Sequence, residues 1–163
     1  MNPPLRAWRL AVLVAAAVVL VDQVTKRIVV DSLDRGEHIN VFLGIEITYV
    51  RNKGVAFGAL GGGGTLVTVV TVAAVLLLAL YFAFHTSKPW LWLPFGAVAG
   101  GALGNLLDRL REGSVVDWID PIFWPAFNIA DIAIVVGILG LLYVLEGPPK
   151  SGNEGEDEEG WST

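Results

Sequence analysis

The stretch GNLLDRLREGSVVDWIDPIFWPAFNIAD, residues 104–131, decides how the rest of the chain is organised. It begins at the end of one apolar segment and stops just inside the next. Apart from one glutamate it holds four acidic residues, Asp108, Asp117, Asp120 and Asp131, between flanks that are almost purely aliphatic. Ionisable groups at the edge of a membrane segment are costly, so each is a candidate functional residue. We expect Asp117 and Asp131 to meet as a catalytic pair, with the rest of the chain holding them at a membrane surface.

Composition points to a membrane protein with one domain. The 163 residues are 54% hydrophobic, with a mean hydropathy of +0.62 and a net charge of -5. That charge comes from residues 146–163, an acidic tail that we expect to be disordered, so residues 1–145 form the single integral-membrane domain and are neutral overall. No basic patch for nucleic acid is present. The absence of cysteine excludes disulfides, thiolate metal sites and a cysteine nucleophile.

Four apolar segments predict membrane-spanning helices at residues 8–30, 66–84, 90–107 and 128–145. The uninterrupted core of the first covers about 18 Å, short of the roughly 30 Å hydrocarbon layer. This helix must therefore carry Asp22 and Lys26 into the far membrane edge. A cleaved signal peptide is the alternative, but no small-x-small cleavage site precedes the polar cluster. In the third segment Gly96, Gly100 and Gly104 recur every four residues, which favours close approach of another helix.

Residues 31–65, between the first two spans, have the pattern of a small β-structure. Ile45, Ile47 and Tyr49 alternate with other residue types at a period of two, and glycines at 61–64 predict a flexible joint. We expect this insert to lie on the membrane. Four spans place both termini on one side, but basic residues are more numerous on the other, so a positive-inside count alone would place the termini outside.

Polar residues at the helix ends have structural as well as functional interpretations. Asp22 and Lys26 are four residues apart and can pair on one helical face, either as an interfacial ion pair or in direct support of a site. Asn128 and Asp131 have the spacing of an N-cap and an N3 residue, so simple helix capping competes with catalysis. Capping does not explain Asp117, which lies fourteen residues earlier in an apolar context.

The end of the third span presents a polar face. Asn105, Asp108 and Arg109 lie at positions i, i+3 and i+4. The planar fork of Arg109 can donate hydrogen bonds to a carboxylate or to a backbone carbonyl. The structural alternative is a helix end that satisfies its own carbonyls.

Two close carboxylates suit peptide hydrolysis. Because both cannot ionise cheaply at short range, they share a proton. The ionised member can then take a proton from water while the protonated member polarises a carbonyl. Competing chemistries have little support: no HExxH zinc motif occurs, His38 and His85 fall on opposite sides of the membrane in this topology, and no lysine in the last two spans could activate Ser114.

Four motifs, in order along residues 22–131, resemble those of the bacterial lipoprotein signal peptidases (signal peptidase II). They are Asp22-Gln23-x-Thr25-Lys26, Arg51-Asn52-x-Gly54-x-Ala56-Phe57, Gly104-Asn105-x-x-Asp108-Arg109-x-x-x-Gly113-x-Val115-Val116-Asp117, and Phe127-Asn128-x-Ala130-Asp131. Each motif alone is weak, but together they are specific. Trp118 replaces the family's usual Phe or Tyr and keeps an aromatic ring. The acidic tail lies outside the resemblance.

The resemblance implies a mainly α membrane protein, a four-helix transmembrane bundle with a small extracytoplasmic β-cradle inserted between spans one and two. It implies an aspartic endopeptidase that removes the signal peptide of a prolipoprotein just before a diacylglyceryl-modified cysteine. Asp117 and Asp131 would be the catalytic pair. The residues expected to bind substrate are Asn52, Gly54, Asn105, Arg109 and Asn128, and those expected to support the site are Asp22, Lys26, Asp108 and Ala130.

The resemblance also sets expectations about location and partners. It implies a monomer in the bacterial cytoplasmic membrane with cytoplasmic termini and an outward-facing site, against the bare charge count. It implies membrane lipids and prolipoproteins as partners, inhibition by the peptide antibiotic globomycin, and no metal or organic cofactor. A transporter would place acids at mid-span, where spans two to four have none. A structural membrane protein would tolerate Asp117→Asn, whereas a peptidase would not.

Overall fold

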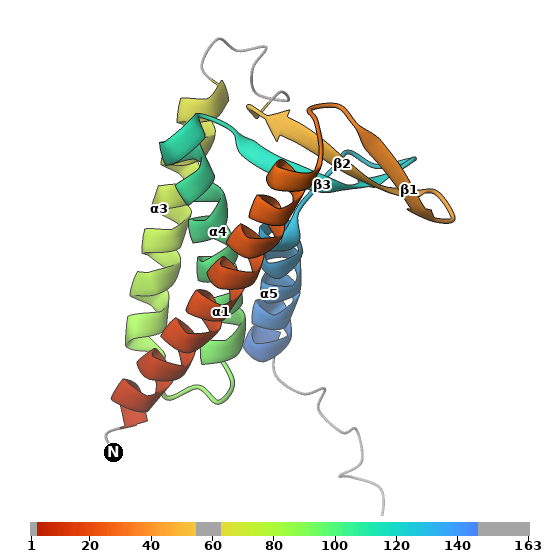
Figure 1. The fold of residues 1–163 in the computed structure, drawn as a ribbon. Coiled ribbons are helices and arrows are strands. Elements are labelled where there is room, and N and C mark those ends of the chain that lie inside the picture. The colour runs from red at the N-terminus through yellow and green to blue at the C-terminus, as the bar shows by residue number, and fades with distance from the viewer. Residues whose placement is uncertain (1–2, 55–62, 147–163) are drawn as a thin grey trace, which may run out of the picture.

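In the part of the chain that the structure describes, four helices form a bundle and three strands form a sheet across one end of it (Figure 1). The computed structural model describes residues 3–54 and 63–146. The helices are α1 Pro3–Ser32, α3 Gly63–Phe84, α4 Trp92–Glu112 and α5 Ile129–Glu146. The strands are β1 His38–Phe42, β2 Ile45–Asn52 and β3 Val115–Pro121. The motif residues Ala56 and Phe57, glycines 61 and 62 of the expected joint, and the tail from residue 147 lie outside the described residues.

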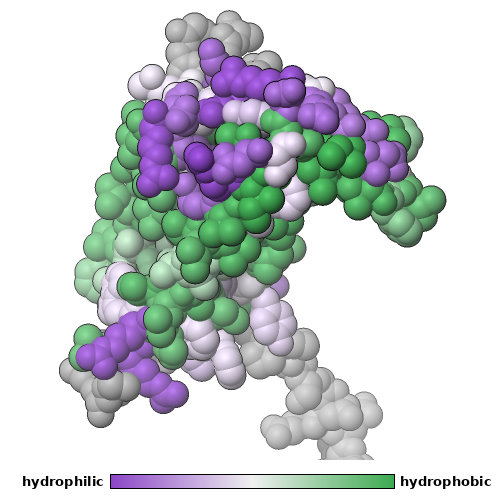
Figure 2. All heavy atoms as spheres, viewed as in Figure 1, coloured by the Kyte–Doolittle hydropathy of each residue, from purple (hydrophilic) through white to green (hydrophobic). Residues whose placement is uncertain are grey.

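The bundle is that of a multi-pass membrane protein. Three described helical segments are long and apolar enough to cross a membrane: Pro4–Ser32, Gly64–Phe84 and Ile129–Glu146. Figure 2 shows apolar residues along the helices, with polar residues gathered at both ends. The helix α4 corresponds to the third expected span but is not among these three candidates. It packs against each of the other three helices and carries buried Asn105 and Asp108.

Glycines on α4 let two neighbouring helices approach its backbone, which confirms the expected close packing. A Cβ added at Gly96 would lie 2.6 Å from the carbonyl oxygen of Ala11, and one at Gly100 would lie 2.7 Å from that of Ala15. Both contacts are with α1. Gly101, which the sequence pattern did not single out, faces the backbone of Ala130 in α5 in the same way. Helix α4 is therefore fixed between α1 and α5, the two helices that bring Asp22, Lys26 and Asp131 to the site.

The sheet is antiparallel with the order β1-β2-β3, and its third strand was missed by the sequence analysis. Only residues 31–65 were expected to form β-structure. Instead β3 pairs with β2 from Asn52↔Val115 to Ile45↔Pro121, with an irregularity between Ile47 and Val50. The β-structure is thus not confined to the insert between α1 and α3, because the connection from α4 to α5 supplies one strand.

The outer end of the sheet exposes large apolar side chains. The hairpin tip between β1 and β2 carries Phe42 and Leu43, and the segment after β3 carries Phe123 and Trp124, which are all exposed. The two segments are adjacent, since the backbone N–H of Ile122 donates to the carbonyl of Gly44 over 3.0 Å. In Figure 2 apolar residues cover this projecting edge. Such a patch suits contact with lipid, and the expectation that the β-structure lies on the membrane stays a prediction.

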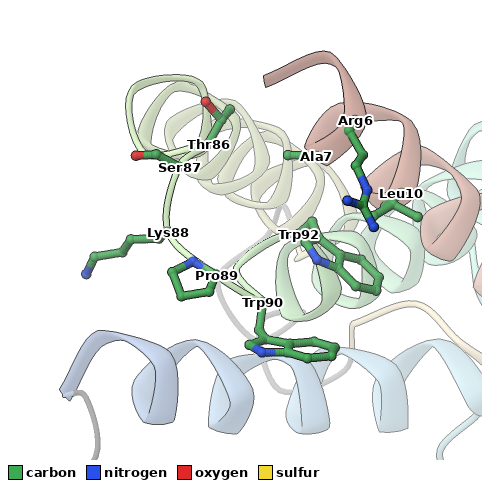
Figure 3. A pocket seen from close by; sticks show the side chains of 9 residues that line it. All are labelled: Arg6, Ala7, Leu10, Thr86, Ser87, Lys88, Pro89, Trp90 and Trp92. Atoms are coloured by element: carbon green, nitrogen blue, oxygen red, sulfur yellow. The ribbon is translucent and has the colours of Figure 1, made fainter. Parts of the chain in front are cut away.

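A pocket lies at the other end of the bundle, away from the sheet (Figure 3). Its lining residues come from the start of α1 and from the connection between α3 and α4: Arg6, Ala7, Leu10, Thr86, Ser87, Lys88, Pro89, Trp90 and Trp92. None of these residues is acidic. The carboxylates that could do proton chemistry therefore gather elsewhere, beneath the sheet.

Candidate active site

Asp117 is placed by β3, directly above the bundle. Asp117 is only 2% exposed, and Val115 and Val116, which precede it in the strand, are also buried. The carboxylate accepts a hydrogen bond from the side-chain amide of Asn128 over 2.7 Å and another from that of Asn52 over 3.0 Å. Since Asn52 ends β2 and Asn128 precedes α5, two other elements hold Asp117 in place.

Asp131 lies in the first turn of α5 and caps that helix together with Asn128. The Asp131 N–H donates to Asn128 Oδ1 over 3.0 Å, and the Asn128 N–H donates to Asp131 Oδ2 over 3.3 Å. This is the reciprocal capping box that the spacing allowed. The other oxygen of Asp131 accepts a 2.8 Å hydrogen bond from the amide of Asn105. Capping and a place in the polar site are thus compatible, because the two carboxylate oxygens serve different partners.

Two asparagines join the carboxylates into one network. Asn128 is fully buried, caps α5 through Oδ1, and donates from Nδ2 to Asp117 Oδ1 and, over 3.1 Å, to Asn105 Oδ1. Asn105 in turn donates to Asp131. An amide carries both donors and an acceptor, so it can bridge two carboxylates and fix both. The two aspartates expected to act together are therefore brought into one site.

Behind this pair lies a buried ion cluster centred on Lys26. The ammonium is 2.9 Å from Asp22 and 2.8 Å from Asp108, and all three residues are less than 10% exposed. The same ammonium donates to Asn105 Oδ1 over 3.0 Å, so it helps to orient an amide that contacts Asp131. The expected pairing of Asp22 with Lys26 is confirmed, and Asp108 completes it.

Asp22 and Asp108 also bind backbone groups of neighbouring elements. Asp22 Oδ1 accepts a hydrogen bond from the N–H of Ala130 at the start of α5 over 3.0 Å, so the backbone of Ala130 is fixed beside the buried ions. Asp108 Oδ2 accepts from the N–H of Val116, next to Asp117, over 3.3 Å. Gly104 leaves room for Asp22, because a Cβ there would lie 2.6 Å from Asp22 Oδ2. The buried ions thus lock α1, α4, α5 and β3 together.

Gly54 hydrogen-bonds to Asn52 and Arg109 hydrogen-bonds within its own helix, and their expected role in substrate binding stays a prediction. The N–H of Gly54, whose φ is 77°, donates to Asn52 Oδ1 over 2.8 Å and so turns the Asn52 amide nitrogen toward Asp117. A left-handed φ favours glycine here. Arg109 donates to the backbone carbonyl of Asn105, at 3.4 Å, and no ion pair of Arg109 occurs among the described residues. The helix-end interpretation of Arg109 therefore describes its contact here.

Gln23 belongs to the first sequence motif but was not predicted to be a site residue, and the structure places it in the polar site. Its amide nitrogen donates to Asp108 Oδ1 over 2.9 Å, and it lies 3.3 Å from the carbonyl of Gly104 and 3.2 Å from Asp22 Oδ2. Its oxygen accepts from Arg111. The sequence feature that could have identified Gln23 is its position beside Asp22 and within one helical turn of Lys26.

Burial sets the proton affinity of Asp117. Its pKa is raised from the ordinary 3.8 to about 6, chiefly because the carboxyl group is removed from water and in part because of the nearby charge of Asp131. The amide hydrogen bonds of Asn52 and Asn128 and the charge of Lys26 oppose this rise. Asp131 is more accessible to solvent. The two carboxyl groups therefore lie in unequal environments, which is the condition for one to be protonated while the other is ionised.

Comparisons with known proteins agree with this geometry. The family model described as signal peptidase (SPase) II matches residues 14–146. A lipoprotein signal peptidase of Pelotomaculum thermopropionicum is 47% identical over 82% of this chain and 89% of its own. One of Halothermothrix orenii is 38% identical over 86% and 98%.

Solved structures give the same result. A structure described as a bacterial membrane enzyme solved by the in meso method superposes with a TM-score of 0.75 at 34% identity, covering 86% of this chain and 93% of the other. The family match covers α1 from residue 14 onward, the whole of α3, α4 and α5, the sheet, and the polar residues of the site described above. The chain therefore belongs to the signal peptidase II family.

Proposed function

We propose that this chain removes signal peptides from prolipoproteins, as the names of its relatives indicate, with Asp117 and Asp131 as the catalytic pair. The observation that carries the assignment is the amide bridge. Asn128 contacts both aspartates, and the two aspartates come from different elements at the end of an apolar bundle. The contact of Asn128 with Asp131 caps α5, but its contact with Asp117 is not needed for a helix cap, since Asp117 belongs to β3.

The unequal surroundings assign a role to each carboxyl. Asp117, buried and with a raised pKa, is the protonated member and donates its proton to the oxygen of the scissile carbonyl. Asp131, closer to solvent and bound by two N–H donors, is the ionised member and takes a proton from the attacking water. The C–N bond of the resulting tetrahedral intermediate then breaks as Asp131 passes the proton it took from water to the leaving amine. The carbonyl re-forms as Asp117 takes back its proton from a hydroxyl of the intermediate, which restores both carboxyl groups.

The asparagines and Arg109 have separate tasks in this scheme. Asn52, Asn105 and Asn128 hold the carboxylates and offer amides that can exchange partners with a substrate backbone. Within residues 3–54 and 63–146, the side-chain hydrogen bond of Arg109 is to a carbonyl of its own helix, at 3.4 Å, so Arg109 can turn to a substrate carbonyl at little cost. Asp22, Lys26 and Asp108 act as positioning residues behind them.

The position of the site fits a substrate that stays in the bilayer. The polar network lies where the apolar helices end, so the signal helix can pack on the bundle while a diacylglyceryl group on the adjoining cysteine remains in lipid. We place the sheet and the site on the outer face of the bacterial cytoplasmic membrane, with both termini in the cytoplasm. We further propose that the enzyme works as a monomer among membrane lipids and that globomycin inhibits it.

The test uses one prolipoprotein in two forms, with and without the diacylglyceryl group, and the full chain reconstituted in lipid nanodiscs. We expect cleavage just before the modified cysteine, and we expect globomycin to block it. Cleavage of the unmodified form should be at least about tenfold slower, because burying the two acyl chains of a diacylglyceryl group in lipid is worth well over 1.4 kcal/mol. Equal cleavage of both forms would show that the diacylglyceryl group is not needed for substrate recognition. No cleavage of either would favour the transporter or structural alternatives.

A further inference from the structure

Three metal-ligating side chains meet on the sheet, away from the catalytic pair. His38 of β1, Glu46 of β2 and Asp120 of β3 each offer one ligand atom, and these atoms all lie within 4.8 Å of one another. His38 Nδ1 is 3.0 Å from Glu46 Oε2 and 3.6 Å from Asp120 Oδ2. One imidazole nitrogen from the edge strand thus faces a carboxylate from each of the other two strands.

The strand register forces the two carboxylates together. Glu46 and Asp120 are direct partners in the pairing of β2 with β3. Like charges at opposed positions of a sheet destabilise the pairing. Across residues 3–54 and 63–146, no lysine or arginine forms an ion pair with Glu46 or Asp120, and His38 is the one basic partner. A protonated imidazole could balance only one of the two negative charges, whereas a divalent cation balances both.

We propose that His38, Glu46 and Asp120 form a structural site for a first-row divalent cation of the Zn²⁺ type. One imidazole nitrogen and two carboxylate oxygens are ligands that Zn²⁺ accepts, with water in the fourth position. Ligand atoms of a tetrahedral zinc site lie about 3.4 Å apart, since each is roughly 2.1 Å from the metal. The observed separations need only small rotamer changes, and the side chains are 45%, 31% and 27% exposed, so ion and water can reach them.

Such an ion would join all three strands of the sheet. Every residue of β1 is exposed, and its pairing with β2 is broken by an irregularity between Asn40 and Phe42, so little burial holds this edge strand. Strands β2 and β3 carry Asn52 and Asp117 at their other ends. The ion would therefore fasten the outer part of the same sheet that positions Asp117, without taking part in the chemistry.

The test measures Zn²⁺ binding to the full chain in detergent, purified without a polyhistidine tag and stripped of metal. Isothermal titration should give one site, and the H38A and D120N variants should each bind at least about tenfold more weakly, the range for loss of a metal partner. H85A is the matched control because His85 is the chain's other histidine and contacts Tyr81 at the far end of the bundle. It should bind as the wild type does.

Two further measurements locate the ion. Hydrogen exchange of residues 38–42 should slow when Zn²⁺ is added, and D117N should bind Zn²⁺ with unchanged affinity. The proposal would be overturned if H38A bound Zn²⁺ as tightly as the wild type, or if D117N lost Zn²⁺ binding. It would also be overturned if acid pH, but not Zn²⁺, protected residues 38–42 from exchange. Ca²⁺ and Mg²⁺, which prefer oxygen ligands throughout, should protect less than Zn²⁺.

Discussion

Asp117 shows how burial of one carboxyl can set a pH response. Its folded pKa of about 6 exceeds the ordinary 3.8, so the folded protein holds this proton more tightly than the unfolded chain. The associated stability is fully present below about pH 3.8 and is lost as pH rises through about 6. In the proposed mechanism the same proton is needed for catalysis.

We therefore predict that kcat/KM for a lipidated prolipoprotein falls as pH rises through about 6 in the free enzyme, because Asp117 then ionises beside ionised Asp131. The measurement is a pH profile of kcat/KM at constant ionic strength, with protein integrity checked at each pH. The apparent pKa belongs to the pair of carboxyls. A profile that instead rises through pH 6 would mean that Asp117 acts in its ionised form and would reverse the two roles.

Lys26 holds two buried carboxylates, and its loss should be far more costly than the loss of an exposed cation. Lys26→Met leaves Asp22 and Asp108 buried without their counter-ion, so we expect a loss of about 3–5 kcal/mol in the free energy of unfolding. The matched control is Arg27→Met, next in sequence, whose partner Asp31 is 52% exposed. It should cost about 0–1 kcal/mol. Unfolding in mixed micelles measures both, and equal losses would contradict the central role of Lys26.

Helix α4 depends on its glycines for contact with α1. A Cβ at Gly100 would lie 2.7 Å from the carbonyl oxygen of Ala15 and 2.8 Å from its Cα, so the backbones must separate. We predict that Gly100→Ala destabilises the protein by about 1–3 kcal/mol, the usual cost of overpacking. Gly64→Ala in α3 is the control, because its added Cβ would lie 3.7 Å from the carbonyl oxygen of Lys53, in ordinary van der Waals contact. Thermal unfolding of both variants in detergent should separate them, and an equal effect would refute the close packing.

The helices were predictable from the sequence, whereas the complete sheet was not. Apolar segments located each helix to within about five residues. Helix α1 begins earlier, at Pro3, and α4 continues to Glu112, where Asp108 and Arg111 hydrogen-bond to Gln23 of α1. Strand β3 was not predicted because residues 115–121 lack a clear period-two pattern, since Asp117 and Asp120 are three residues apart. Its partner β2 is more than sixty residues earlier, and such pairing leaves no local signal.

The site was predictable as a set of residues but not as a network. The motifs contained Asp117, Asp131, the asparagines and the buried ions, and the structure brings these together. Which amide faces which oxygen depends on the tertiary packing of α1, α4, β3 and α5, so sequence spacing could not show that Asn128 bridges both aspartates or that Gln23 joins Asp22 to Asp108. Spacing alone also could not decide whether Arg109 donates to a carboxylate or to a backbone carbonyl.

At the scale of the whole molecule, the bundle separates two chemically different ends. The sheet and the polar network occupy one end, and the connection from α3 to α4 with its basic and tryptophan residues occupies the other. The proposed orientation, with the site on the outer face of the cytoplasmic membrane, can be tested directly. The chain has no cysteine, so single cysteines introduced at exposed positions report on one side each.

We predict that Asp34→Cys, just after α1, reacts with a membrane-impermeant maleimide in intact cells, and that Ser87→Cys, between α3 and α4, reacts only after the membrane is opened. Both residues are exposed, so the two variants differ in side and not in access. The cysteine-free parent chain controls for background labelling. Labelling of Ser87→Cys but not Asp34→Cys in intact cells would place the site in the cytoplasm and contradict the proposed orientation.

The most direct test is cleavage of a diacylglyceryl-modified prolipoprotein by Asp117→Asn and Asp131→Asn, each compared with the wild type and with Asp31→Asn, an exposed acid at the end of α1. An asparagine keeps the shape of the carboxyl group but can neither give up nor hold the proton. We expect both catalytic variants to lose at least about 10³-fold in kcat/KM, in the range for a general acid or base, and to unfold near the wild-type temperature, while Asp31→Asn keeps full activity. Normal cleavage by either well-folded catalytic variant would contradict the assignment of Asp117 and Asp131 as the catalytic pair.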